Sequence, residues 1–189
     1  MAADMEARFK ELEAKVRELT DREALRDLRY RYHECINEGQ FAEIPNLFTA
    51  DADLDFGALG KARGREQLIK FFGAMDMTSP EAGKSPLRVS YIKQFVHNHT
   101  VHVHGDTGHG FAYLEAKTVF NGVACLVAGR YNDEYVRQNG EWKFSKMHVT
   151  PFFVVPHNES WADEKTRMRP PRRSDSPKTT WSKTFQSRL

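Results

Sequence analysis

Cysteine is scarce in this sequence, and so are segments that would direct the chain out of the cytoplasm. Only two cysteines, Cys35 and Cys125, occur among 189 residues, which is typical of free thiols in a reducing compartment. No apolar run approaches the ~20 residues that a membrane-spanning helix needs. Residues 1–15 are charged throughout and have no apolar signal core. These absences predict a cytoplasmic protein with no membrane partner.

Signatures of several other function classes are missing as well. The formal net charge is only +2, which argues against a dedicated nucleic-acid-binding protein. The sequence contains no glycine-rich phosphate loop, nucleotide-binding fingerprint or nucleophile elbow. It also lacks the cysteine pairs and the His-Glu-x-x-His helix that commonly complete a zinc site. We therefore expect no nucleic-acid partner and no metal.

The first pattern that the sequence does contain is an amphipathic helix at its amino terminus. Five apolar residues are spaced 4, 3, 4 and 3 positions apart, with charged residues between them: Met5, Phe9, Leu12, Val16 and Leu19. Such a narrow apolar stripe is typical of a helix that pairs with another helix. The stretch from Thr20 to Glu23 has the pattern of a capping box, which predicts that a second helix begins there. Residues 1–19 are thus expected to be a separate helix that builds a homo-oligomer.

Helical patterns come first along the chain, and strand patterns follow. The elements expected before residue 87 are a helix starting at Thr20, a short helix over 41–48, a strand over 52–56, a helix over 64–75 and a loop over 77–86. From Leu87 to Val155, three turn signals, two of which are Asn-Gly, separate four strands. Helices followed by an antiparallel meander are typical of the α+β class. We expect residues 20–155 to form a cone, in which the amino-terminal helices close a curved antiparallel sheet around an apolar pocket. Residues 156–189 form an extension that either caps the pocket or is disordered.

Half of the histidines lie within eight residues of one another, which raises the question of a metal site or a catalytic strand. They are His97, His99, His102 and His104. Two histidines on the same face of a strand supply only two of the three or four ligands that zinc requires. Imidazole is, however, the commonest general acid or base near neutral pH. His97 and His99 are therefore catalytic candidates, whereas His102 and His104 are expected to face solvent.

The register of this strand decides which of its side chains reach the pocket. If Gln94 points inward, strand alternation turns Lys93 and His97 outward. The apolar positions after residue 100 alternate one residue out of step with Gln94. A β-bulge at 98–100 reconciles the two registers and can turn His99 inward. A shift by one residue would instead make Lys93 an alternative base, whose pKa desolvation would have to lower.

The last two strands carry further candidates. In the last strand, Trp142 and Phe144 are expected core residues, and alternation then turns His148 inward as an acid or base. The alternative for His148 is a place at the rim of the sheet with a backbone partner. On the preceding strand, Tyr131 can protonate or anchor a substrate hydroxyl, and Asp133 can polarise a histidine or pair with an arginine.

Three segments, in order along the chain, resemble the SnoaL-like branch of the nuclear-transport-factor-2-like superfamily. They are LTDREALRDLRYRYHECINEGQFAEIPNLFTADADLDFG, GREQLIKFF and GRYNDEYVRQNGEWKF, and the resemblance covers about residues 12–155. It implies the same cone-shaped α+β fold. It also implies proton transfer inside a largely apolar pocket without a cofactor, as in the scytalone and bile acid dehydratases, ketosteroid isomerases and aromatic-dimer lyases of the superfamily.

Carried over position by position, the resemblance implies an altered active site. Tyr32 matches the tyrosine that dehydratase-like members place in the first core helix. Asn37 stands where those members have an aspartate, Phe56 where they have a second tyrosine, and Gln94 where they have the catalytic histidine. Amide side chains do not transfer protons at neutral pH, but they can hold a hydroxyl or an oxyanion.

Together these patterns predict a cofactor-independent lyase or dehydratase. Thirteen phenylalanines favour an apolar, aromatic and hydroxylated substrate, which would lose water or a one-carbon fragment such as formaldehyde. The expected catalytic residues are Tyr131 or Tyr32 for the departing hydroxyl and His148, His97 or His99 for the proton, and the expected substrate-binding residues are Asn37, Gln94, Phe56, Lys93 and Asp133. The alternatives are a ketosteroid-isomerase-like isomerase and a non-catalytic protein of the same fold that binds small molecules.

Overall fold

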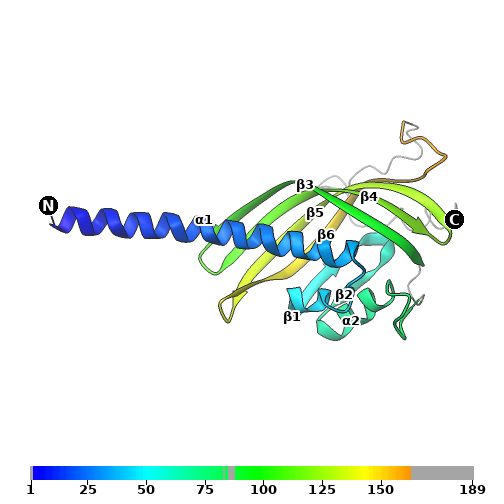
Figure 1. Cartoon of the computed structure of the whole chain (residues 1–189), viewed down its shortest axis with the longest axis horizontal. Helices are drawn as coiled ribbons and strands as arrows, with labels where there is room; N and C mark the ends of the chain where they lie inside the picture. Colours follow the sequence, from blue (N-terminus) through cyan, green and yellow to red (C-terminus); the bar gives the residue numbers. More distant parts are fainter. Residues whose placement is uncertain (1, 83, 85–87, 163–189) are drawn as a thin grey trace, which may run out of the picture.

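The computed structural model describes residues 2–82, 84 and 88–162, and it has the expected α+β class (Figure 1). Its α-helices are α1 (Ala2–Asn37) and α2 (Arg65–Gly73), and short 3₁₀ turns span Ile44–Leu47 and Gly57–Leu59. The strands are β1 (Phe48–Asp55), β2 (Lys61–Arg63), β3 (Val89–His104), β4 (Thr107–Phe120), β5 (Val123–Gln138) and β6 (Glu141–Pro156). No helix in this part of the chain is long and apolar enough to span a membrane.

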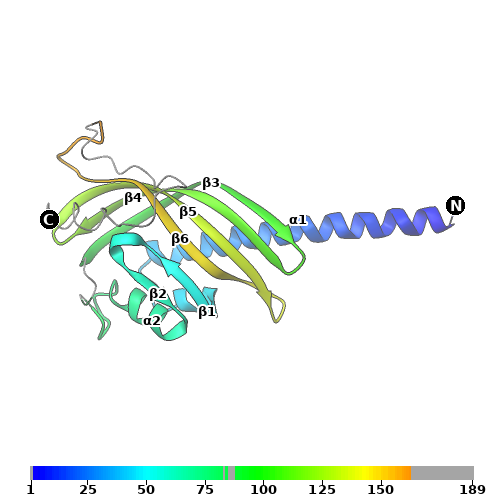
Figure 2. The ribbon, with the colours of Figure 1, turned by 180° about the vertical axis from the view of Figure 1, so that it is seen from behind.

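The six strands form one curved, open sheet in the order β2-β1-β6-β5-β4-β3. The four long strands β3 to β6 are a consecutive antiparallel meander, as predicted. Strand β1 departs from the expected antiparallel pattern because it pairs in parallel with β6. Helix α1 runs across the inner face of the curved sheet, and α2 lies near the edge formed by β1 and β2 (Figure 2). The apolar core fills the space between α1 and this inner face.

Two of the expected hairpins close at Asn-Gly pairs, and the backbone there explains the residue choice. Asn121 and Asn139 have φ angles of 49° and 53°, and the glycine that follows each also has a positive φ. Two successive positive φ angles define the type I′ turn, whose twist matches that of the flanking strands. The long strands therefore begin and end close to the predicted positions.

The predicted break between two helices at Thr20 is wrong, because α1 continues from Ala2 to Asn37. The stretch contains neither glycine nor proline, so nothing in the backbone interrupts the helix. The carboxylate of Asp21, within the supposed capping box, instead accepts a hydrogen bond from Trp142 Nε1 at 3.2 Å and pairs with Arg137 at 2.5 Å. The first half of α1 consequently extends away from the body of the molecule (Figure 1).

The expected short helix over 41–48 is replaced by the single 3₁₀ turn Ile44–Leu47, and β1 starts earlier than predicted, at Phe48. Pro45 lies in the first turn, where its missing N–H is tolerated, and the turn is too short to develop into an α-helix. Of the expected carboxy-terminal extension, residues from 163 onward lie outside the part of the chain that the structure describes.

Candidate active site

The inner face of the sheet encloses an apolar cavity of about 50 Å³. Its lining comes from β3 to β6 and from the segment after β1: Phe56, Leu59, Ile92, Gln94, Leu114, Ala116, Thr118, Phe120, Val127, Tyr131, Val149, Pro151 and Val154. Only three of these side chains are polar, and Thr118 donates its hydroxyl to the backbone oxygen of Tyr91 at 2.9 Å. Gln94 and Tyr131 are thus the polar side chains that can meet a ligand in this cavity.

Gln94 and Tyr131 form one hydrogen-bonded pair. The hydroxyl of Tyr131 donates to Oε1 of Gln94 at 2.9 Å, and both residues are buried. The guanidinium of Arg29 lies 4.2 Å from the centre of the Tyr131 ring. Burial raises the pKa of Tyr131 above its ordinary value, although the Arg29 charge opposes this shift. The phenol is therefore protonated at neutral pH, with a cation in place to stabilise the phenolate if the proton leaves.

Asn37 fixes the backbone of Gln94 rather than extending into the cavity lining. Its amide nitrogen donates to the Gln94 carbonyl at 2.9 Å, and its Oδ1 accepts from the Gln94 N–H at 2.7 Å. Lys93 donates its ammonium group to the backbone oxygen of Asn37. These bonds join the last turn of α1 to β3. The side chains of Asn37 and Lys93 therefore hold the backbone around Gln94 in place.

Behind Tyr131 lies a buried polar cluster formed by α1, β3 and β5. Arg29 and Asp133 make a fully buried ion pair. The Tyr135 hydroxyl donates to Asp133 Oδ2 at 2.9 Å and lies 3.1 Å from His99 Nε2. Burial raises the pKa of Asp133, while Arg29 and Tyr135 act in the opposite direction. Tyr32 packs edge-on against Tyr131 with ring centres 6.1 Å apart, and burial raises the pKa of its hydroxyl as well.

Two imidazoles in this cluster are neutral, and their hydrogen bonds define where each proton sits. Burial and the nearby Arg29 charge lower the pKa of both His33 and His99 to about 3. His33 Nδ1 lies 2.9 Å from the Arg29 carbonyl, which can only accept, so Nδ1 carries the proton. Its Nε2 is buried, unprotonated and without a hydrogen-bond partner among the described residues. The His33 ring also packs edge-on against Tyr131, with centres 5.5 Å apart.

The same reasoning applies to His99. Because the Tyr135 hydroxyl donates its proton to Asp133, it can only accept from His99 Nε2. His99 Nδ1 is then the unprotonated nitrogen, and it is buried with no partner in the described part of the chain. His99 turns inward because of the predicted bulge: pairing with β4 shifts between His97 and Thr100, and Asn98 has a φ of 47°.

The predicted register of β3 is confirmed, but that of β6 is wrong. Gln94 is buried, whereas Phe95 and His97 are exposed, and His97 lies 3.8 Å from Glu115 on the outer face. In β6 the pairing with β5 shifts between Glu134 and Tyr135, so a bulge follows Phe144. Lys146 and His148 consequently point to the outer face, where His148 Nε2 lies 3.4 Å from Asp53.

Sequence reasoning missed Arg29 and His33, which the structure brings next to Tyr131. Both lie on the buried side of α1, at positions four residues apart in line with Leu25. An arginine within an apolar helical stripe predicts a buried acidic partner, and Asp133 between two tyrosines on one strand face is such a partner. An arginine on the apolar side of the helix, together with an aspartate on the inner face of a strand, is the sequence pattern that indicates this ion pair.

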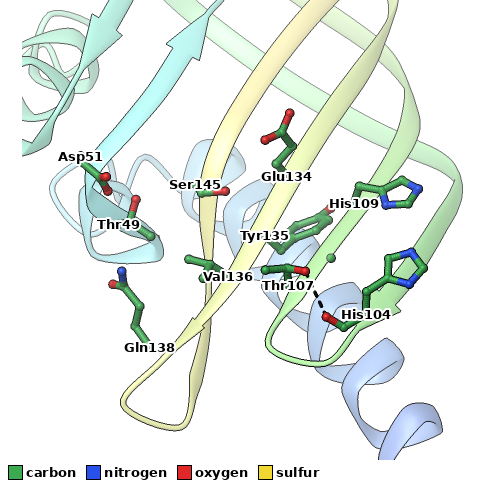
Figure 3. A pocket seen from close by; sticks show the side chains of 11 residues that line it. Thr49, Asp51, His104, Thr107, His109, Glu134, Tyr135, Val136, Gln138 and Ser145 are labelled. Carbon is green, nitrogen blue, oxygen red and sulfur yellow. Dashed lines mark hydrogen bonds between the residues drawn. The ribbon is translucent and has the colours of Figure 1, made fainter.

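A second, larger depression of about 620 Å³ lies near the ends of the strands (Figure 3). Polar side chains such as His104, His109 and Glu134 line it, and the Thr107 hydroxyl donates to the His104 carbonyl at 3.0 Å. His109 stacks on both His102 and His104, and all three are exposed. The described residues contain no group of three or more histidine, cysteine or acidic side chains placed to hold a metal. None of the predicted site residues lies in this depression.

Comparison with known proteins places this geometry among related folds. A family model for the SnoaL-like domain matches residues 17–148. Uncharacterized proteins of Mycobacterium bovis and Mycobacterium tuberculosis are 29% identical over 141 residues, which is 73% of this chain and 90% of theirs.

Two solved structures are similar in fold. A proposed scytalone dehydratase of Novosphingobium aromaticivorans has 15% identity and a TM-score of 0.63, over 83% of this chain and 97% of its own. A hexachlorocyclohexane dehydrochlorinase has 19% identity and a TM-score of 0.66, over 79% of this chain and 98% of its own.

Proposed function

Because the chain belongs to the SnoaL-like domain family, we propose that it is a cofactor-independent lyase or dehydratase acting on an apolar, hydroxylated small molecule. The observation that carries this proposal is the Tyr131–Gln94 pair, which supplies a proton donor and an amide to an otherwise apolar cavity. The names of the two similar structures, a dehydratase and a dehydrochlorinase, both denote eliminations. An elimination has two requirements. The leaving group must receive a proton or be stabilised in another way, and a base must take a proton from carbon.

Tyr131 would give the first proton. A substrate hydroxyl that replaces Gln94 Oε1 as the acceptor of the Tyr131 proton would take up that proton as its carbon–oxygen bond breaks. The Arg29 guanidinium beside the ring would stabilise the phenolate, and the Gln94 amide would orient the substrate. A positioned acid of this kind typically contributes roughly 10²–10⁴-fold to the rate.

A buried imidazole would take the second proton. His148 and His97 lie on the outer face, so this role passes to the unprotonated Nε2 of His33, whose ring packs against Tyr131, or to Nδ1 of His99. The two electrons of the broken carbon–hydrogen bond form the new double bond, and water leaves. Return of the proton from the imidazolium to the phenolate, through water, restores both groups.

A hydroxymethyl group next to the departing hydroxyl would change the product. The base would then take the O–H proton of the hydroxymethyl group. The carbon–carbon bond would break, its electrons would form the new double bond, and formaldehyde would leave together with water. A phenol conjugated to the carbon that loses the hydroxyl would donate electron density as the carbon–oxygen bond breaks and regain it as the carbon–carbon bond breaks, which reduces the need for strong acids and bases in the protein.

The cavity must widen before such a substrate can enter. Its volume of about 50 Å³ exceeds the share of one water molecule, about 30 Å³, but ligand pockets usually measure roughly 300–1,000 Å³. Several lining residues are only partly buried, among them Leu59, Ile92 and Val149. Movement of these side chains would open the cavity toward solvent.

The test is a mass-spectrometric turnover screen in the presence of a chelator. The panel would contain hydroxylated aromatic dimers, polyketide-like phenols, and steroid or terpenoid alcohols. Loss of water, or of water and formaldehyde, from one compound class would support the lyase and identify its substrate. A product of unchanged mass but different retention would instead support a ketosteroid-isomerase-like isomerase.

A non-catalytic binding protein is the second candidate, and one observation favours it. Among the described residues that line the cavity, none is acidic, basic or a histidine, and amides occupy the two positions, Asn37 and Gln94, where dehydratase-like members carry the acid–base pair. Saturable binding of a panel compound, measured by calorimetry, without any turnover would support this candidate and would contradict the lyase.

A further inference from the structure

The amino-terminal half of α1 carries an apolar stripe that its own chain leaves uncovered. Five residues of the stripe expose 60–73% of their surface: Met5, Phe9, Leu12, Val16 and Leu19. Single exposed apolar residues are common, but five in a continuous helical row predict a partner. Their spacing of 4 and 3 is that of positions d and a in a coiled-coil heptad repeat, with Met5, Leu12 and Leu19 at d.

We propose that this stripe is the interface of a parallel, two-stranded coiled coil between two copies of the chain. The residues at the core positions fit two strands, because Leu12 and Leu19 occupy d and the β-branched Val16 occupies a, which is the combination that favours dimers. The helix is already formed, since it continues without a break into the buried part of α1. The second chain therefore does not have to supply the free energy of helix nucleation.

The flanking charges determine the orientation. Positions e hold Glu6 and Glu13, and positions g hold Arg8 and Lys15. In a parallel pair, g of one helix meets e of the other, which sets basic residues against acidic or neutral ones. An antiparallel pair would set e against e and g against g, so that glutamates and basic residues would each meet their own kind.

One ion pair across the interface follows from this register. Arg8, at position g, meets Glu13 of the second copy, at position e. Within the described part of the chain, neither Arg8 nor Glu13 forms an ion pair. In contrast, Lys10 pairs with Glu6 and Lys15 pairs with Glu11. The parallel arrangement thus supplies partners to two charges, Arg8 and Glu13, that form no ion pair within the described residues.

The body of the molecule does not obstruct this interface. At about 100° per residue, the stripe from Met5 to Leu19 lies roughly 160° around the helix from the side that Leu25, Tyr32 and Ile36 bury against the sheet. A second helix can therefore approach α1 on the side that faces away from its own sheet. Because both chains point the same way, the two bodies would lie at the same end of the coiled coil.

The association is tested on the full chain by sedimentation and light scattering over a range of concentrations. The chain is expected at twice the mass of one copy, with dissociation on dilution because the interface is short. Leu12→Asp should give the mass of one copy with an unchanged thermal unfolding midpoint. Ala14→Asp, at the outward-facing position f, is the matched control and should remain dimeric. A single-copy mass for the unaltered chain, or an unchanged mass in Leu12→Asp, would overturn the proposal.

Cross-linking then tests the orientation. In a parallel dimer, Met5→Cys places two thiols at the same layer of the interface, and mild oxidation should link the two copies in high yield. Ala7→Cys, which faces outward, should not be linked. An antiparallel pair would separate the two residue-5 positions by more than about 15 Å, at a rise of 1.5 Å per residue, so absence of the Met5→Cys cross-link in a dimer would contradict the parallel arrangement.

Discussion

At the scale of single residues, the most unusual feature is a pair of neutral imidazoles buried beside a cation. His33 and His99 lie close to Arg29, and burial together with its charge lowers the pKa of each to about 3. Protonating either one would place a second positive charge next to a buried guanidinium. Both imidazoles are therefore unprotonated at neutral pH.

This arrangement predicts an acid-sensitive fold. The ordinary histidine pKa near 6.5 applies to the unfolded chain and about 3 applies to folded His33, so between these values the unfolded state binds more protons. Stability is then unaffected above about pH 6.5 and falls as the pH decreases toward 3. Between pH 7 and pH 5, His33 alone should lower the free energy of unfolding by about 2 kcal/mol.

Unfolding by guanidinium chloride at pH 7 and at pH 5 measures this change in the free energy of unfolding. His33→Gln should reduce the difference in stability between the two pH values, whereas His102→Gln, which alters an exposed histidine, should leave it as in the unaltered chain. An equal pH dependence in His33→Gln and in the unaltered chain would show that His33 is not the buried neutral group described above.

At the scale of elements, the buried pair Arg29–Asp133 joins α1 to β5. Both side chains are fully buried, and removing one partner leaves the other charge without compensation. Arg29→Met should therefore cost about 3–5 kcal/mol. The double variant Arg29→Met/Asp133→Leu removes both charges and should recover part of that loss, because a well-packed apolar pair is often as stable as a buried ion pair. Recovery is incomplete because the buried Tyr135 hydroxyl loses its acceptor.

Urea unfolding of the two variants tests this prediction. Lys10→Met is the control, since it removes one partner of the exposed pair Lys10–Glu6, and such a pair is worth at most about 1 kcal/mol. A loss in Arg29→Met no larger than that in the control, or a double variant no more stable than Arg29→Met, would contradict the structural role assigned to the pair.

The elements also differ in how far the sequence predicts them. The meander, its Asn-Gly turns and the bulge near Asn98 follow from local patterns, because strand alternation and turn chemistry involve neighbouring residues. The bulge in β6 falls at Ser145, with no glycine or asparagine beside it, and it arises from pairing with β5. As a result, His148 was placed on the wrong face.

The same distinction explains the errors in α1. The capping-box pattern at Thr20 is local, but Asp21 is engaged by Trp142, which is 121 residues away. Arg29 likewise becomes explicable only with Asp133, 104 residues later. Candidate residues whose role depends on distant partners, Arg29 and His33 above all, could therefore not be assigned from periodicity alone.

At the scale of the whole molecule, the parts have separate tasks. The curved sheet and the segment after β1 line the cavity that contains Tyr131 and Gln94. The exposed half of α1 carries the stripe proposed to join two copies. Changes in the stripe should thus leave the cavity unaltered, and changes at Tyr131 should leave the association unaltered.

The measurement that tests the central claim most directly compares Tyr131→Phe with the unaltered chain on a substrate from the screen. The variant keeps the ring and its contact with Arg29 but loses the proton donor. The expected result is a decrease in kcat of about 100-fold or more, with a ligand Kd, measured by calorimetry, that changes less than tenfold. Tyr91→Phe, which alters an exposed tyrosine, should turn over normally. Undiminished kcat in Tyr131→Phe would contradict the assignment of Tyr131 as the acid of this site.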